Sequence, residues 1–295
     1  MSLTVSNTSN LQNPFAPFDS ALAAAFDANV NLAIAEDVGN GDYTGLLVPE
    51  NEFVKARVQV RETAVLCGAP WFEAIMARLD PRLRVQWCYA EGELMQADSE
   101  VCVIEGPARA LLTAERGALN FLQLLSGVAS ATRRYVDAIA GTRARILDTR
   151  KTLPGLRLAQ KYAVRVGGGL NQRLALYDGI LIKENHIAAA GGITAAVGAA
   201  IKLNAGVSIQ VEVESLDELN EALAAGAASI LLDNFSLELM REAVHLTARR
   251  AVLEASGGIN MQTVRLIAET GVDRISIGSL TKDISAVDFS MRVIG

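Results

Sequence analysis

Short apolar runs alternate with longer stretches of helical periodicity through the second half of the chain. The apolar runs, rich in Val, Ile and Leu, predict six strands at residues 144–148, 179–183, 208–214, 229–233, 251–256 and 274–278. The stretches around them predict helices at residues 127–140, 155–167, 192–203, 215–225, 236–249 and 260–270. Such alternation is typical of an α/β protein with a parallel sheet. Periodicity fits a closed (β/α) barrel or an open doubly wound sheet, and the polar residues that end nearly every strand favour the barrel.

The first half of the chain predicts a small α+β module. Residues 1–17, which are polar and interrupted by proline, predict a loose arm, and Asp19 can cap the helix that follows. Strands are predicted at residues 53–62, 64–68, 83–89 and 100–106, and helices at residues 69–79 and 107–126. The change of pattern at residue 127 predicts a boundary between two domains.

Polar and glycine residues stand at the carboxyl end of each predicted strand of the second half. In chain order they are Asp148, Arg150 and Lys151; Lys183, Glu184 and Asn185; Glu212 and Glu214; Asp233 and Asn234; Ser256, Gly257 and Gly258; and Gly278 and Ser279. In a (β/α) barrel these ends converge on one face, where such enzymes hold their active sites. The sequence therefore predicts a single site built from all six strands.

Basic side chains are concentrated in residues 148–173, although the chain carries a net charge of −6. They are Arg150, Lys151, Arg157, Lys161, Arg165 and Arg173. Clustered guanidinium groups match planar carboxylates and phosphates, so the segment predicts a local pocket for a polyanion. A solvated basic helix face is the alternative reading. The acidic balance of the whole chain argues against general nucleic-acid binding.

Two glycine-containing turns and two carboxylates suggest which parts of a substrate such a pocket would bind. Ser256-Gly257-Gly258 and the turn at Gly278 each lead into a helical stretch, where backbone N–H groups can hold a phosphate; a plain tight turn is the alternative. Glu212 and Asp233 can face a sugar or bind Mg²⁺, or else pair structurally with Lys183. With two histidines in the chain, a histidine-based metal site is excluded.

Features of the whole chain predict a cytoplasmic protein. Its three cysteines have no CxxC spacing and lie in apolar patterns, which predicts buried thiols in a reducing compartment. The first residues lack the apolar core of a signal peptide. No apolar run approaches the roughly 18 residues of a membrane helix.

Arg116 lies in the middle of a predicted helix, next to Glu115. On sequence alone this position predicts a surface salt bridge.

Blocks along almost the whole chain resemble the quinolinate phosphoribosyltransferase family. In order they are AEDVGNGDYT, TAERGALNFLQLLSG, DTRKTLPGLR, QKYAVRVGGG, LIKENHI, VEVE, ILLDNF, LEASGGI and GVDRISIGSLTK. The resemblance implies the type II phosphoribosyltransferase fold. It places an N-terminal α/β sandwich domain at residues 1–126, joined by the C-terminal tail 286–295, and a barrel of six or seven strands at residues 127–285.

The resemblance also implies a reaction, its cofactor and its residues. Quinolinate and phosphoribosyl pyrophosphate (PRPP) would give nicotinate mononucleotide, pyrophosphate and CO₂ in NAD biosynthesis, with Mg²⁺. Catalytic roles would fall to Lys151, Lys183, Glu212 and Asp233, the last two also meeting the metal. Substrate would be bound by Arg116, Arg150, Gln172, Arg173, Lys183, Ser256, Gly257, Gly258, Gly278 and Lys282. Arg116 would enter the neighbouring site of a homodimer or higher homo-oligomer, which replaces the salt-bridge reading.

One position departs from the family pattern. Many members have Asn-His-Arg where this chain has Asn171-Gln172-Arg173. Glutamine can donate a hydrogen bond but carries no charge, so we predict a weaker pH dependence near neutrality than in a histidine-bearing relative. Three alternatives remain: a nicotinate-specific enzyme, the molybdenum-transport-associated paralogue, and a non-catalytic barrel that binds phosphoribosyl compounds.

Overall fold

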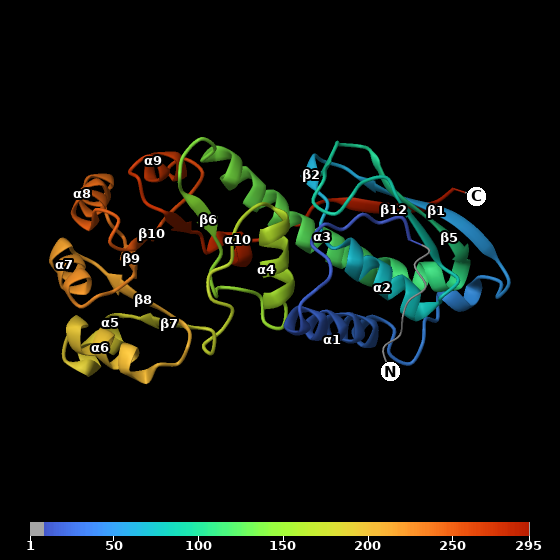
Figure 1. Cartoon of the computed structure of the whole chain (residues 1–295). Helices are drawn as coiled ribbons and strands as arrows, with labels where there is room; N and C mark the ends of the chain where they lie inside the picture. The colour runs from blue at the N-terminus through green and yellow to red at the C-terminus, as the bar shows by residue number, and fades with distance from the viewer. Residues whose placement is uncertain (1–8, 295) are drawn as a thin grey trace. The chain divides into compact units, whose positions relative to one another are not determined.

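The computed structural model describes residues 9–294, which form two compact units (Figure 1). The first unit contains residues up to Ala131 together with Leu153–Gly167 and the residues from Asp283 onward. The second contains Thr132–Thr152 and Gly168–Lys282. The predicted helix at residues 155–167 thus belongs to the first unit, whereas the sequence assigned it to the barrel.

The first unit is built on a four-stranded antiparallel sheet with strand order β12-β1-β5-β3. These strands are β1 (Phe53–Val60), β3 (Arg84–Trp87), β5 (Glu100–Pro107) and β12 (Phe289–Val293); β2 (Ala64–Val65) and β4 (Leu94–Met95) pair separately. Its helices are α1 (Ser20–Asp37), α2 (Ala69–Leu79), α4 (Arg157–Val166) and most of α3 (Ala108–Ala138), with a short 3₁₀ turn at Gly45–Leu47. Alternate residues of β1 are buried, as expected for a strand with one face on a core.

Helix α3 joins two predicted helices into one of 31 residues. A break was expected near Gly127, but this glycine serves close packing instead. A Cβ at this position would lie 2.3 Å from the carbonyl oxygen of Ser285, so the missing side chain lets the returning chain approach the helix. The boundary between the units, at Ala131, therefore falls inside a continuous helix.

Helix α4 belongs to the first unit because of Tyr162. This ring is buried and lies 5.3 Å, centroid to centroid, from that of Trp71 on α2. Its hydroxyl donates a hydrogen bond to the buried carboxylate of Glu91. Helical periodicity predicted α4 correctly, but it could not show which core receives its apolar face.

The described part of the N-terminal segment is anchored, which corrects the expected loose arm for residues 9–17. The amide of Asn10 makes two hydrogen bonds to the backbone of Trp87, donating to its oxygen at 3.0 Å and accepting from its nitrogen at 2.7 Å. Phe15 packs edge-on against Tyr162. Residues 1–8 lie outside the described residues.

The second unit is a six-stranded parallel sheet with strand order β6-β11-β10-β9-β8-β7 (Figure 1). The strands are β6 (Arg145–Leu147), β7 (Gly179–Ile182), β8 (Ser208–Val213), β9 (Ser229–Asp233), β10 (Val252–Ser256) and β11 (Arg274–Ser276). The helices are α5 (Glu184–Ala190), α6 (Ile193–Leu203), α7 (Leu216–Ala224), α8 (Leu237–Thr247), α9 (Val264–Ala268) and α10 (Ser279–Lys282). This confirms the six predicted strands and the parallel α/β class.

The sheet has the topology of a (β/α) barrel with a seam beside β6. Among the described residues, β6 and β7 share no ladder. Leu170 forms a parallel bridge with Leu147 instead, and its amide donates to the carbonyl oxygen of Ile146 at 2.8 Å. The segment that leads to Gln172 and Arg173 thus runs along the free edge of β6, which places both residues beside the strand ends.

Two further sequence expectations are settled by the structure. The thiols are free, and Cys67 and Cys102 are buried as predicted, but Cys88 is exposed because it follows the end of edge strand β3. No single helix of the described chain is long and apolar enough to cross a membrane, although the bent pair α5 and α6 together meets that length and composition.

Candidate active site

The carboxyl ends of the parallel strands carry most of the predicted site residues. Strand register places Glu212 of β8 beside Leu231 of β9, and Asp233 two residues further along β9 beside Ser256 of β10. Because side chains alternate along a strand, Glu212 and Asp233 point to the same face of neighbouring strands. The convergence expected of a barrel is therefore present for these carboxylates.

Lys183 and Glu212 form an ion pair across the ends of β7 and β8. The Lys183 ammonium lies 2.8 and 3.1 Å from the two carboxylate oxygens of Glu212. The glutamate side chain is 10% exposed and the lysine side chain 43% exposed, so the pair opens toward solvent on the lysine side. His186 accepts a hydrogen bond at Nδ1 from the backbone nitrogen of Lys183, which caps the start of α5.

The positive charges of Arg150 and Arg173 lie close enough to repel each other. Arg173 donates to the carbonyl oxygen of Gly179 at 2.9 Å. Its pKa is lowered by burial and by the charge of Arg150, which outweigh the opposing influence of Asp178. The Nε of Arg150 is buried and has no hydrogen-bond partner among the described residues. A buried donor without a partner points to a missing acceptor, and an anion would supply one.

The basic cluster predicted at residues 148–173 is divided by the fold. Arg150, Lys151 and Arg173 belong to the second unit, whereas Arg157, Lys161 and Arg165 lie on α4 in the first. Lys161 is buried, and Arg165 stacks over the ring of Tyr162 at 6.0 Å. Arg150, Lys151 and Arg173 are therefore the members of this cluster that lie in the unit of the parallel sheet.

Glycine positions shape the opposite side of the site. Gly257 has φ of +101°, and a Cβ there would fall 2.1 Å from Oδ1 of Asn234. Gly258 is also left-handed, with φ of +59°, but faces open space. Gly278 lies under the side chain of Lys151, whose Cδ would be 3.1 Å from an added Cβ. The absence of a side chain at Gly257 and Gly278 lets Asn234 and Lys151 pack against these two turns. A phosphate bound there could contact both backbone N–H groups and the lysine.

A further tether holds Lys151 in this position. The hydroxyl of Thr281 on α10 donates to the backbone oxygen of Lys151 at 2.8 Å. Lys282, the next residue, is exposed at the end of the same short helix. The Lys151 side chain therefore lies against Gly278, and Lys282 follows four residues later at the end of α10.

Glu212 and Asp233 suit a Mg²⁺ ion whose remaining ligands come from a bound substrate and water. The described residues contain no group of three or more His, Cys, Asp or Glu that could hold a metal by themselves. Mg²⁺ is commonly bound by one or two carboxylates, with substrate phosphates and water completing its shell. Glu212 and Asp233, on adjacent strands, match that donor set, and Asp233 already accepts a hydrogen bond from Asn234 at 2.8 Å.

Arg116 lies on α3 in the first unit, and its side chain is exposed. Burial raises the pKa of Glu115 and the charge of Arg116 opposes that rise. No ion pair of Arg116 is formed within the part of the chain that the structure describes. The salt bridge suggested by the sequence alone is therefore not found.

Two interior residues of the site were not predicted from the sequence. Glu254 and Gln210 lie on β10 and β8 and are buried, and both bond to Gln172. The available signal was a glutamate in the middle of the apolar strand AVLEAS, where a charge requires an interior partner. Its partners could not be found from periodicity because they come from two distant segments.

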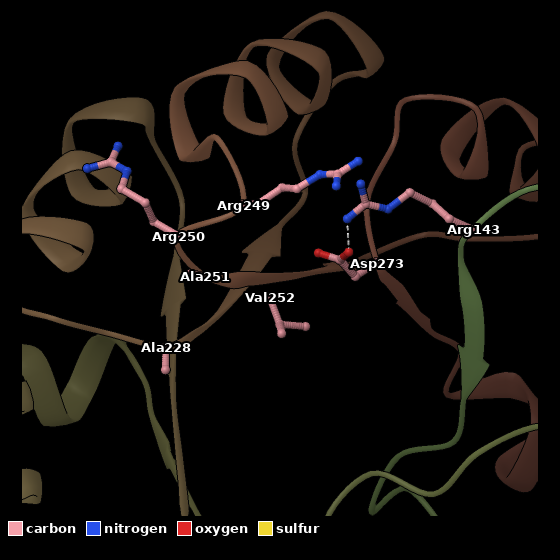
Figure 2. A pocket seen from close by; sticks show the side chains of 7 residues that line it. All are labelled: Arg143, Ala228, Arg249, Arg250, Ala251, Val252 and Asp273. Carbon is pink, nitrogen blue, oxygen red and sulfur yellow. Dashed lines mark hydrogen bonds and ion pairs between the residues drawn. The ribbon is translucent and has the colours of Figure 1, made fainter.

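A concave region of about 440 Å³ lies at the amino-terminal ends of the strands (Figure 2). Arg143 pairs there with Asp273, and Arg250 donates to the carbonyl oxygens of Leu246 and Thr247 at the end of α8. These two cations therefore already have partners within the unit. The amino-terminal face of such barrels usually contributes stability, so we assign the catalytic site to the opposite edge.

The carboxyl edge of this parallel (β/α) sheet combines a Lys–Glu pair, an arginine with a buried, unpartnered Nε and left-handed glycine turns. These features define an enzyme class that binds phosphorylated, acidic substrates. Two family models match the chain: "Quinolinate phosphoribosyl transferase, N-terminal domain" at residues 42–126 and "Quinolinate phosphoribosyl transferase, C-terminal domain" at residues 128–292. The chain therefore belongs to the quinolinate phosphoribosyltransferase family.

Individual relatives agree with that assignment. A probable nicotinate-nucleotide pyrophosphorylase (carboxylating) of Bacillus subtilis is 40% identical over 266 residues, covering 90% of this chain and 92% of the relative. The carboxylating enzyme of Mycobacterium leprae is 39% identical, covering 90% and 97%. The solved nicotinate-nucleotide pyrophosphorylase of Francisella tularensis superposes with a TM-score of 0.90 at 44% identity, covering 92% of this chain and 96% of that one.

Proposed function

We propose that this protein transfers the phosphoribosyl group of PRPP to quinolinate with loss of CO₂, giving nicotinate mononucleotide and pyrophosphate for NAD biosynthesis. Family membership supports the reaction, and the buried, unpartnered Nε of Arg150 supports an acidic substrate at this site. Quinolinate carries two neighbouring carboxylates. Arg150, Arg173 and Lys183 are the cations we assign to them.

We assign the remaining residues to PRPP. Lys151 would meet the pyrophosphate, and Ser256, Gly257, Gly258, Gly278 and Lys282 the 5′-phosphate. Glu212 and Asp233 would hold Mg²⁺ and face the ribose. When bound, Mg²⁺ would neutralise charge on the pyrophosphate leaving group.

The chemistry needs positioning and charge more than proton transfer. The pyridine nitrogen attacks C1 with its own lone pair as the C1–O bond to pyrophosphate breaks, so no general base is required. Glu212 and Asp233 stabilise the positive charge that develops on the sugar. After the N–C1 bond forms, the quaternised ring accepts the electron pair released when the adjacent carboxylate leaves as CO₂, and a proton then takes its place on carbon.

We also propose a homodimer or higher homo-oligomer in which Arg116 enters the neighbouring subunit's site. Asp42 accepts a hydrogen bond from Thr113 on α3 at 2.9 Å, which holds the following segment against the helix one turn before Arg116. Tyr43, Leu46 and Leu47 in this segment are 83, 63 and 83% exposed. Large exposed apolar side chains beside an exposed arginine suit a contact with a second copy of the chain.

A cytoplasmic location remains part of the proposal. The free thiols, two of them buried, suit a reducing compartment.

The deciding experiment is a parallel assay with PRPP and Mg²⁺, supplying either quinolinate or nicotinate. We expect mononucleotide and CO₂ from quinolinate and no product from nicotinate. Product from nicotinate alone would overturn the assignment of the three cations. Absence of product from both would favour the paralogue or the non-catalytic phosphoribosyl-binding barrel.

A further inference from the structure

The side chain of Gln172 is committed to the interior of the second unit. Its Nε2 lies 2.9 Å from Oε1 of Gln210 and 3.0 Å from each carboxylate oxygen of Glu254. Its Oε1 accepts a hydrogen bond from the backbone nitrogen of Arg173 at 2.8 Å. Both ends of the amide therefore have protein partners, which leaves little capacity for a substrate contact.

Glu254 is the centre of this group. Its side chain is fully buried, and it accepts hydrogen bonds from the amides of Gln172 and Gln210, the latter at 3.0 Å. Within residues 9–294 its carboxylate has no ion-pair partner. A buried carboxylate that loses a hydrogen-bond donor carries a large desolvation cost. The amide of Gln172 is therefore held in place against Glu254.

A second buried carboxylate grips the same segment. Asp148 accepts from Nδ2 of Asn171 at 2.6 Å and from the backbone nitrogen of Gln172 at 2.9 Å. Residues 171 and 172 are thus held between Asp148 and Glu254, both with no exposed surface. Arg173 is the next residue, and its starting direction is set by these anchors and by the bond to Gln172 Oε1.

We infer that Gln172 is a positioning residue that aims Arg173 at the acidic substrate and does not touch the substrate itself. This inference rests on the proposed function, because it takes Arg173 to bind a quinolinate carboxylate. It revises the direct substrate contact that the family resemblance implied for Gln172. It also gives a reason for an uncharged side chain: an amide can donate to Glu254 and accept from the Arg173 backbone at every working pH.

The test is a double-mutant cycle of Gln172→Leu with Arg173→Ala, read as KM for quinolinate, KM for PRPP and kcat. In the wild-type background we expect Gln172→Leu to raise the quinolinate KM about tenfold to a hundredfold, since a misplaced binding group can cost that much. The KM for PRPP should change little. In the Arg173→Ala background the same substitution should have almost no further effect. A purely structural role would not separate the two substrates in this way.

Additive effects in the cycle would overturn the inference, because they would mean that Gln172 acts on quinolinate independently of Arg173. Wild-type protein without activity on quinolinate would instead refute the proposed function. Urea unfolding of each variant verifies that it folds.

If Gln172→Leu fails to fold, the exchange Gln172→Glu with Glu254→Gln provides the test. It restores a carboxylate–amide pair with the roles reversed. Rescue of the quinolinate KM relative to Gln172→Glu alone supports positioning. An unrescued KM contradicts it, since a carboxylate in direct contact would repel the dianion in both variants.

Discussion

The ammonium group of Lys183 lies 2.8 Å from one carboxylate oxygen of Glu212, at the ends of two adjacent parallel strands. The pair leaves Lys183 partly open to solvent while Glu212 is nearly covered. Each side chain can therefore hold its partner in place before substrate arrives. Such preorganisation matters most at sites where charge develops during the reaction.

Glu212→Gln should lower kcat/KM by about a hundredfold to a thousandfold, the cost of removing one group that stabilises a transition-state charge. The free energy of unfolding of this variant should change by less than about 1 kcal/mol, because water solvates the Lys183 ammonium group in place of the lost carboxylate. Steady-state kinetics and urea unfolding measure the two effects. Glu269→Gln is the matched control, since Glu269 pairs with Arg265 on an exposed helix face. Equal losses in both variants would contradict a catalytic role.

Gly257→Ala should damage both stability and PRPP binding. At φ of +101° an alanine is strained, and its Cβ would overlap Asn234. We expect a loss of about 1–3 kcal/mol in the free energy of unfolding and a raised KM for PRPP. Gly258→Ala is left-handed as well but meets open space, so about 1 kcal/mol is expected from backbone strain alone. Equal destabilisation by the two substitutions would contradict the role of Asn234.

Arg116→Ala and Asp233→Asn should each be inactive, yet regain activity when dissociated and mixed. If Arg116 serves the neighbouring site, a hybrid dimer contains one intact site, and random mixing should restore about a quarter of wild-type activity. The control is Lys183→Ala mixed with Asp233→Asn, in which every hybrid site stays defective. Recovery no greater than in this control would place Arg116 within its own subunit's site.

Stability should fall as pH rises from 4.5 to 7, through Glu91. Burial raises the pKa of this carboxyl from 4.5 to about 7, although it accepts hydrogen bonds from the backbone nitrogens of Gly68 and Ala69. In this window the unfolded chain releases the proton that the folded chain retains, so the unfolding free energy decreases by about 3 kcal/mol, at about 1.4 kcal/mol per pH unit.

Urea unfolding of the wild type and Glu91→Gln between pH 4.5 and 8 tests this expectation. The difference between the two proteins should change through that window and level off once the pH has passed the folded pKa of about 7. Parallel curves would show that Glu91 does not titrate there.

The regular part of the fold could be predicted because its signals are local. The six parallel strands arise from short β-branched runs, and the polar residues at their ends follow from strand order alone. The convergence of Lys183 with Glu212 was predicted in the same way, because neighbouring parallel strands present their carboxyl ends on one edge. The anchoring of residues 9–17 was not, since their polar composition gives no sign of hydrogen bonds to a distant edge strand.

The sequence by itself determined the element types, the parallel sheet and the chemical nature of the strand ends, because each depends on residues close together in the chain. Only the tertiary structure decided which core receives α4, that Arg150 keeps a buried unpartnered Nε, and that Gln172 turns inward to Glu254. These depend on contacts between segments tens of residues apart, in which burial and hydrogen-bond satisfaction select a partner that no local pattern specifies.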